Sequence, residues 1–150
     1  MVQLNLPPAN LIISCEDGNK QLVFDPIRKK RVAFTPEEQV RQSFVQYLVG
    51  HKQYPISHIA NEQAINLNGL SRRCDSVVYD KDGNPKVIIE YKAPSVSISA
   101  KTFAQISRYN LVLKVDYLIV SNGLKHYCVK MDYASQSYTF LTDIPDYTSL

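Results

Sequence analysis

Two apolar runs joined by a cluster of turn residues constrain the fold more than any other feature of the sequence. The runs Cys74–Tyr79 and Lys86–Tyr91 are rich in valine, isoleucine and tyrosine, which favour β-strands. The segment between them reads Asp-Lys-Asp-Gly-Asn-Pro, a dense set of turn formers. The sequence therefore predicts a β-hairpin with Asp82-Gly83 at its tip.

This register places two carboxylates opposite each other. Asp75 faces Glu90, and residues that face each other on neighbouring strands have Cβ atoms about 4.5–5.5 Å apart. Like charges at that distance are destabilising unless a positive charge lies between them. Lys92 follows Glu90 by two positions, so the pleat turns it to the same face. The pattern predicts a site for a hard divalent cation such as Mg²⁺, which binds carboxylates, water and phosphate oxygens.

Taken singly, these charged residues are also typical of an exposed sheet face. Their neighbours argue otherwise, because Val77-Val78 and Val87-Ile88-Ile89 indicate strands that are buried on both faces. Unpaired charges are costly in such strands. The context therefore favours a functional site.

A helix is predicted upstream of the hairpin, over Pro36–Val49. Thr35 supplies an N-cap hydroxyl, proline stands at the first helical position, and Gly50 stands where a left-handed C-cap is expected. Residues 1–34 are predicted to be an N-terminal extension with a β-hairpin, and residues 35–150 the main domain within one compact unit. The hairpin of the extension is formed by Leu11–Ser14 and Gln21–Phe24.

The remaining elements predict the fold class. Further strands are expected at Ile59–Leu67, Tyr117–Val120, Leu124–Met131 and Tyr138–Leu141, with a second helix at Thr102–Leu113. Helix and strand do not alternate strictly along this order. We therefore expect an α/β domain with a mixed β-sheet flanked by helices.

Composition narrows the class of protein. Of the 150 residues, 45% are hydrophobic and 21% charged, and the net charge is +3, so any nucleic-acid surface must be local. Candidates for phosphate contacts are basic residues near the extension and before the hairpin: Lys29, Lys30, Arg31, Arg72 and Arg73. The three cysteines form no C-x-x-C pair and are expected to be free thiols. No membrane segment or signal sequence is predicted, and the cytoplasm is the expected location.

The hairpin sequence also resembles a known family of nucleases. Arg73-Cys74-Asp75-Ser76-Val77-Val78-Tyr79 and Ile88-Ile89-Glu90-Tyr91-Lys92-Ala93-Pro94 resemble the PD-(D/E)XK signature, with Cys74 where the name of the motif has proline. The pattern is most similar to the N-terminal nuclease domain of type I restriction enzyme R (HsdR-like) subunits. Further segments carry the same resemblance: Pro36–Gln42, Gln105–Asn110 and Tyr117–Gly123.

The resemblance implies a restriction-endonuclease-like fold and a set of site residues. Asp75 and Glu90 are the implied metal ligands, with the backbone carbonyl of Tyr91 as a further one, and Lys92 is the implied catalytic lysine. Mg²⁺ is the implied cofactor, with Mn²⁺ as a substitute. Other implied catalytic residues are Gln105 and Tyr109, which match a Q-x-x-x-Y motif, and Glu38, with Glu37 as the alternative.

Spacing adds two independent observations on these residues. Gln105 and Tyr109 are four positions apart, on one helix face. Helical phase does not decide between Glu37 and Glu38, since Glu38 also fits the capping box of Thr35. Glu62, in the predicted strand Ile59–Leu67, is a further acidic candidate for the site, but no local pattern supports it.

The expected function is metal-dependent hydrolysis of DNA phosphodiester bonds. None of the five glycines precedes a lysine, so the sequence contains no phosphate-binding loop of the ATPase type. We therefore expect a homodimer or a larger complex that supplies a motor or sequence specificity. The alternative is a catalytically silent nuclease-like module that binds nucleic acid or a partner protein.

Overall fold

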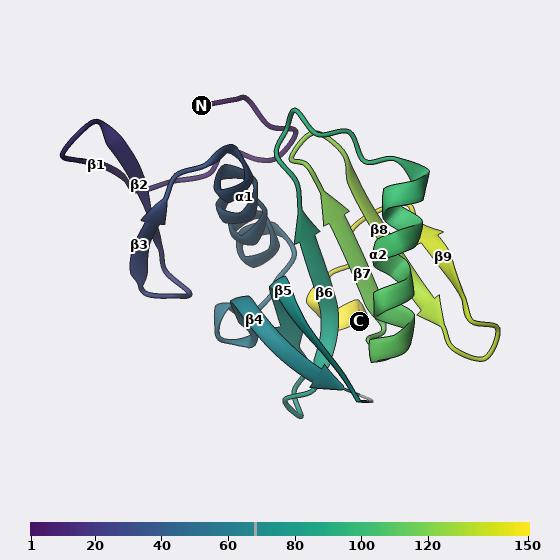
Figure 1. Cartoon of the computed structure of the whole chain (residues 1–150). Helices are drawn as coiled ribbons and strands as arrows, with labels where there is room; N and C mark the ends of the chain where they lie inside the picture. The colour runs from purple at the N-terminus through teal and green to yellow at the C-terminus, as the bar shows by residue number, and fades with distance from the viewer. Residues whose placement is uncertain (68) are drawn as a thin grey trace.

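The computed structural model describes residues 1–67 and 69–150 (Figure 1). The N-terminal part forms an antiparallel sheet of β1 (Ile13–Glu16), β2 (Lys20–Asp25) and β3 (Lys30–Ala33). The predicted hairpin of β1 and β2 is confirmed. Strand β3 was not predicted, because Lys-Arg-Val-Ala has no apolar alternation.

Helix α1 (Pro36–His51) begins as predicted and ends later. The hydroxyl of Thr35 accepts a hydrogen bond of 3.0 Å from the backbone N–H of Glu38, so the N-cap is confirmed. The prediction that Gly50 caps the C-terminus is wrong. Gly50 lies within the helix, and the left-handed residue after it is Gln53, with φ of 63°.

The main sheet contains strands β4 to β9 side by side in chain order. Their bounds are β4 Ile59–Leu67, β5 Leu70–Tyr79, β6 Pro85–Tyr91, β7 Tyr117–Ser121, β8 His126–Asp132 and β9 Ser137–Leu141. Strands β6 and β7 are parallel because α2 (Ala100–Leu113) connects them, and the other neighbours are antiparallel. The predicted mixed sheet is confirmed. Short 3₁₀ helices lie at Ile56–His58 and Tyr147–Ser149.

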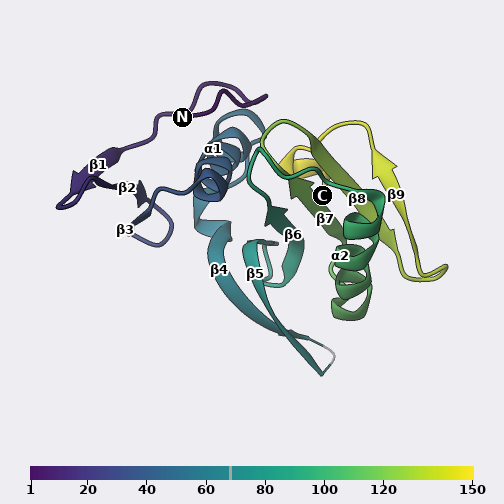
Figure 2. The same cartoon turned by 45° about the horizontal axis from the view of Figure 1, so that its top comes forward.

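The two helices cover opposite faces of this sheet (Figure 2). On the α1 side, Phe44 and Leu48 pack against Ile89 and neighbouring strand residues. On the α2 side, Phe103 packs in a cluster that contains Ile88. The apolar middles of β5 and β6, Val77-Val78 and Val87–Ile89, are therefore buried on both faces of the sheet, as predicted. The hairpin that carries the candidate site is thus held rigidly by the core.

Two further predictions concern cysteines and membranes. Cys15 is an exposed free thiol, and Cys74 and Cys128 are buried free thiols. Among the described residues, no helix is long and apolar enough to cross a bilayer.

Candidate active site

The β5–β6 hairpin brings Asp75 and Glu90 together as the register predicted. The ladder pairs Val78 with Val87 and continues to Ser76 opposite Ile89. Beyond this pair, the N–H of Tyr91 donates to Asp75 Oδ2 at 2.9 Å. The carboxylate of Asp75 therefore replaces a backbone carbonyl of β5 as the hydrogen-bond acceptor. The carboxyl groups of Asp75 and Glu90 are close enough for Asp75 to raise the pKa of Glu90.

Glu90 is the more perturbed member of this pair. Its side chain is 12% exposed. Burial and the charge of Asp75 raise the pKa of Glu90 to about 8, although Arg72 and Lys92 act in the opposite direction. The guanidinium of Arg72 lies 2.5 Å from Glu90 Oε1. The pair therefore attracts positive charge, and a cation beside it favours its ionised form.

Lys92 faces the same side of the sheet as Glu90. Alternation along β6 puts Ile88, which packs on the α2 side, on one face with Glu90 and Lys92. The charge of Lys92 lowers the pKa of Glu90. The backbone of Lys92 is fixed by a 2.8 Å hydrogen bond from its N–H to the carbonyl of Ser121, at the end of β7. The parallel strand pair thus fixes the backbone that carries the Lys92 side chain.

The two acidic residues of the first turn of α1 have different environments. Glu38 is buried and ion-paired with Arg28 at 2.9 Å and with Arg41 at 3.0 Å. Glu37 is exposed as a whole residue, but the protein around it partly desolvates its carboxyl. This desolvation and the charge of Asp75 raise the pKa of Glu37, whereas the charge of Lys92 lowers it. The structure thus brings Glu37 to the site and occupies Glu38 elsewhere, which reverses our order of preference between them.

Arg41 links α1 to the site, and sequence reasoning missed it. The side chain of Arg41 lies 2.7 Å from Glu62 and donates at 2.7 Å to the carbonyl of Asp75. It also lies over the ring of Tyr91, 5.8 Å from the centroid. The sequence did contain a signal for this role, because Arg41 directly follows the apolar Val40 in the helix. Both residues are buried, and a buried arginine must find partners. Glu62 is thereby engaged by Arg41 and by Arg73.

A buried chain of hydrogen bonds connects the N-terminal sheet to the same hairpin. The Asn61 amide donates to Asp25 at 3.0 Å, and the Ser76 hydroxyl donates to Asn61 at 2.6 Å. The Tyr91 hydroxyl donates to Ser76 at 2.9 Å. All four residues of this chain are buried. We call Asp25, Asn61, Ser76 and Tyr91 the polar chain; it fixes the backbone on which Asp75 and Glu90 are carried.

The donor set fits a magnesium ion. Among the described residues, no group of three or more His, Cys, Asp or Glu side chains forms a metal cage. Mg²⁺ does not need one, because it binds through one or two carboxylates and otherwise keeps waters and phosphate oxygens. Asp75 and Glu90 supply such a pair, and the hydrogen bond from the N–H of Tyr91 turns its peptide backbone toward Asp75.

The other predicted residues are distributed differently. Gln105 is exposed on α2, and Tyr109 belongs to α2 but its side chain lies outside the described part of the structure. Arg73 is ion-paired with Glu62, and Arg72 with Glu90, so neither is a free surface cation. Three predicted basic residues of the N-terminal sheet are exposed: Lys29 in the turn between β2 and β3, and Lys30 and Arg31 at the start of β3.

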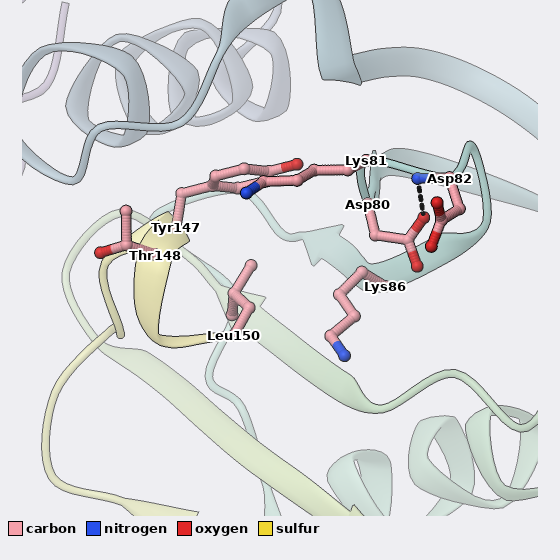
Figure 3. A pocket seen from close by; sticks show the side chains of 7 residues that line it. All are labelled: Asp80, Lys81, Asp82, Lys86, Tyr147, Thr148 and Leu150. Carbon is pink, nitrogen blue, oxygen red and sulfur yellow. Dashed lines mark hydrogen bonds between the residues drawn. The ribbon is translucent and has the colours of Figure 1, made fainter.

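A hollow of about 320 Å³ lies at the opposite end of the same hairpin (Figure 3). Its lining comes from the hairpin turn and the C-terminal segment: Asp80, Lys81, Asp82, Lys86, Tyr147, Thr148 and Leu150. Asp80 Oδ1 accepts the backbone N–H groups of Asp82 and Asn84, both at 2.9 Å, so this carboxylate holds the turn. The hollow is separate from the Asp75–Glu90 pair.

Comparison with known proteins gives one match. A family model described as the type I restriction enzyme R protein N terminus matches residues 36–145. The matched range contains Asp75, Glu90 and Lys92 and begins at the first residue of α1; the sheet of β1, β2 and β3 precedes it. No curated protein matches the chain.

Proposed function

The chain belongs to the type I restriction enzyme R protein N-terminal family, and we propose that it hydrolyses phosphodiester bonds of DNA with the help of Mg²⁺. The observation that carries this proposal is the Asp75–Glu90 pair on a buried hairpin. Burial and mutual repulsion raise the pKa of Glu90 to about 8. A buried carboxyl pair with a strongly raised pKa destabilises the metal-free protein and is typical of a functional site.

Asp75, Glu90 and the carbonyl of Tyr91 are the proposed ligands. When bound, the ion polarises the scissile phosphate and lowers the pKa of a bound water. Mn²⁺ has the same oxygen-ligand preference and is the proposed substitute.

The side chains around the pair orient the reaction. Lys92 donates hydrogen bonds to the attacking water or to a non-bridging phosphate oxygen, where negative charge develops. The Glu37 carboxylate, whose pKa is raised, accepts the proton of the water. As the new bond to phosphorus forms, the bond to the leaving oxygen breaks, and that oxygen takes up a proton from solvent. Arg41 holds the carbonyl of Asp75 and is a positioning residue.

Cleavage of supercoiled plasmid tests the proposal. Wild type is expected to nick the plasmid in Mg²⁺ and not in EDTA, while Asp75→Ala, Glu90→Ala and Lys92→Ala remain folded and inactive. Asp82→Ala and Lys81→Ala remove the same charges from the exposed hairpin turn and are expected to cut like wild type. Wild-type cutting by any of the three site variants removes that residue from the mechanism.

One combination of results favours the alternative function. Metal binding and DNA binding without nicking identify a silent module or one that needs a partner, in agreement with the larger complexes that the family name implies.

Cutting both strands of a duplex in one event needs two sites, so we also propose a homodimer. A monomeric mass by light scattering at the concentration of the assay contradicts the dimer.

A further inference from the structure

The segment that leads from the candidate site through α2 has an unusual charge distribution. Residues 91–115 contain no aspartate or glutamate. The cations of this segment are Lys92, Lys101, Arg108 and Lys114. A stretch of one sign next to a phosphodiester site creates a local field that attracts a polyanion, although the net charge of the chain is only +3.

Helix α2 presents part of this charge in one row. Lys101, Gln105 and Arg108 are spaced by four and three positions, so they lie on one helix face. All three are exposed, while Phe103 on another face is 4% exposed and packs into the core. We call these three residues the α2 row.

The cations of the α2 row are available, unlike most arginines of the chain. Within the described residues, no ion pair engages Lys101 or Arg108. By contrast, every cation near the carboxylates that sequence analysis assigned to DNA, namely Arg72 and Arg73, is paired with a glutamate. A lysine or arginine without a protein partner is available to neutralise a DNA phosphate, and this neutralisation releases counterions that were condensed on the DNA.

The surface at the α2 row is hollowed. A depression of about 480 Å³ is lined by Lys101, Ala104, Gln105 and Arg108. At Arg108 it meets a second depression of about 580 Å³, lined also by Leu111, Lys114, Tyr133 and Gln136. The two depressions follow the helix and share a cation, so a chain of phosphates can lie along them with a positive group at each end.

The fold places helix α2 on the side of the sheet that Glu90 and Lys92 face. Residues 92–99 connect the end of β6 to the N-terminal end of α2 (Figures 1 and 2), and Lys101 is the second residue of that helix.

We propose that the α2 row binds the phosphate backbone of DNA and guides the strand to Asp75 and Glu90. The inference rests on the proposed function for the identity of the polymer. Contacts to phosphates position a nucleic acid and carry no sequence information, so the surface predicts binding that is independent of sequence.

Fluorescence anisotropy with labelled duplex DNA in EDTA tests this surface without cleavage. The full chain is titrated at several KCl concentrations as wild type, Lys101→Ala/Arg108→Ala and the matched control Lys20→Ala/Lys81→Ala. Each double variant removes two exposed lysine or arginine charges. We expect the α2 variant alone to reduce the slope of log K against log salt by about 1.8 and to weaken binding equally for unrelated sequences.

A third variant, Lys29→Ala/Lys30→Ala, tests the rival surface at the β2–β3 turn. The inference is overturned if wild type does not bind, if both α2 and control variants change the slope equally, or if only the β2–β3 variant changes it. Plasmid nicking in Mg²⁺ separates this result from the proposed function. Binding through the α2 row without nicking supports this surface and identifies a silent module or one that needs a partner. Nicking by wild type with unchanged DNA binding by the α2 variant supports the nuclease and overturns this surface.

Discussion

Removal of the Asp25 carboxylate is predicted to destabilise the chain strongly. Its side chain is fully buried and accepts hydrogen bonds from the N–H of Ile27 at 2.7 Å and from the Asn61 amide at 3.0 Å. The guanidinium of Arg28 is a further partner, at 17% exposure. Loss of one partner of a buried ion pair costs about 3–5 kcal/mol. Arg28 keeps its ion pair with Glu38, but the N–H of Ile27 and the amide of Asn61 lose their buried acceptor. Asp25→Ala is therefore expected to lower the free energy of unfolding by about that amount.

Urea unfolding followed by circular dichroism measures this effect. With a slope near 2 kcal/mol/M for a domain of this size, the midpoint is expected to fall by about 2 M. Asp17→Ala, in the exposed turn between β1 and β2, is the matched control and is expected to leave the midpoint unchanged. A change of less than about 0.5 kcal/mol for Asp25→Ala refutes the argument, since surface substitutions give values in that range.

The same residue predicts a pH dependence. Burial alone would raise the pKa of Asp25, but hydrogen bonds from Arg28 and Asn61 hold it below its usual range. A carboxyl whose pKa is lower in the folded state stabilises that state above its unfolded pKa and loses this effect as the pH falls. Wild type is therefore expected to lose more stability than Asp25→Asn between pH 5 and pH 2. Parallel pH profiles contradict this assignment.

Three further substitutions are predicted to have measurable effects. Arg41→Lys keeps the charge but loses the planar fork that reaches the carbonyl of Asp75, so the nicking rate is expected to fall at least tenfold while DNA affinity by anisotropy is unchanged. Because the pKa of Glu90 is raised to about 8, ionisation of the unfolded state destabilises the metal-free fold as pH rises from 4.5 toward 8. Glu90→Gln is thus expected to be more stable than wild type by about 2–5 kcal/mol at pH 8 in EDTA, with the difference lost near pH 4.5 in urea titrations. Gly123 has φ of +84° and a Cβ there would lie 2.7 Å from Leu4 Cδ2, so Gly123→Ala is expected to lower the free energy of unfolding by about 1–3 kcal/mol.

The central hairpin was predictable because its determinants are local. The turn residues fix the register, and the register alone puts Asp75 opposite Glu90. The wrong assignment at Gly50 has a local cause as well. A glycine near the end of an apolar helical pattern predicts a C-cap, but here the helix continues one residue past Gly50 to His51.

The supports of the site were not predictable from local patterns. Asp25, Arg41 and Asn61 each meet partners far along the chain, such as Asn61 with Asp25. Periodicity reports which face of an element is buried, but not which polar group crosses from another element. Helical phase could not decide between Glu37 and Glu38 for the same reason, since the ion pair of Glu38 with Arg28 depends on how β2 and β3 pack beside α1.

Isothermal titration of Mg²⁺ and Mn²⁺ measures whether Asp75 and Glu90 bind a metal ion. We predict saturable binding by wild type that is lost in Asp75→Asn/Glu90→Gln, a double variant that preserves the shape of the pair and removes its charge. Asp80→Asn/Asp82→Asn, at the exposed turn, is predicted to bind like wild type. Equal binding by wild type and the Asp75/Glu90 variant contradicts the assignment of these two carboxylates as the metal site.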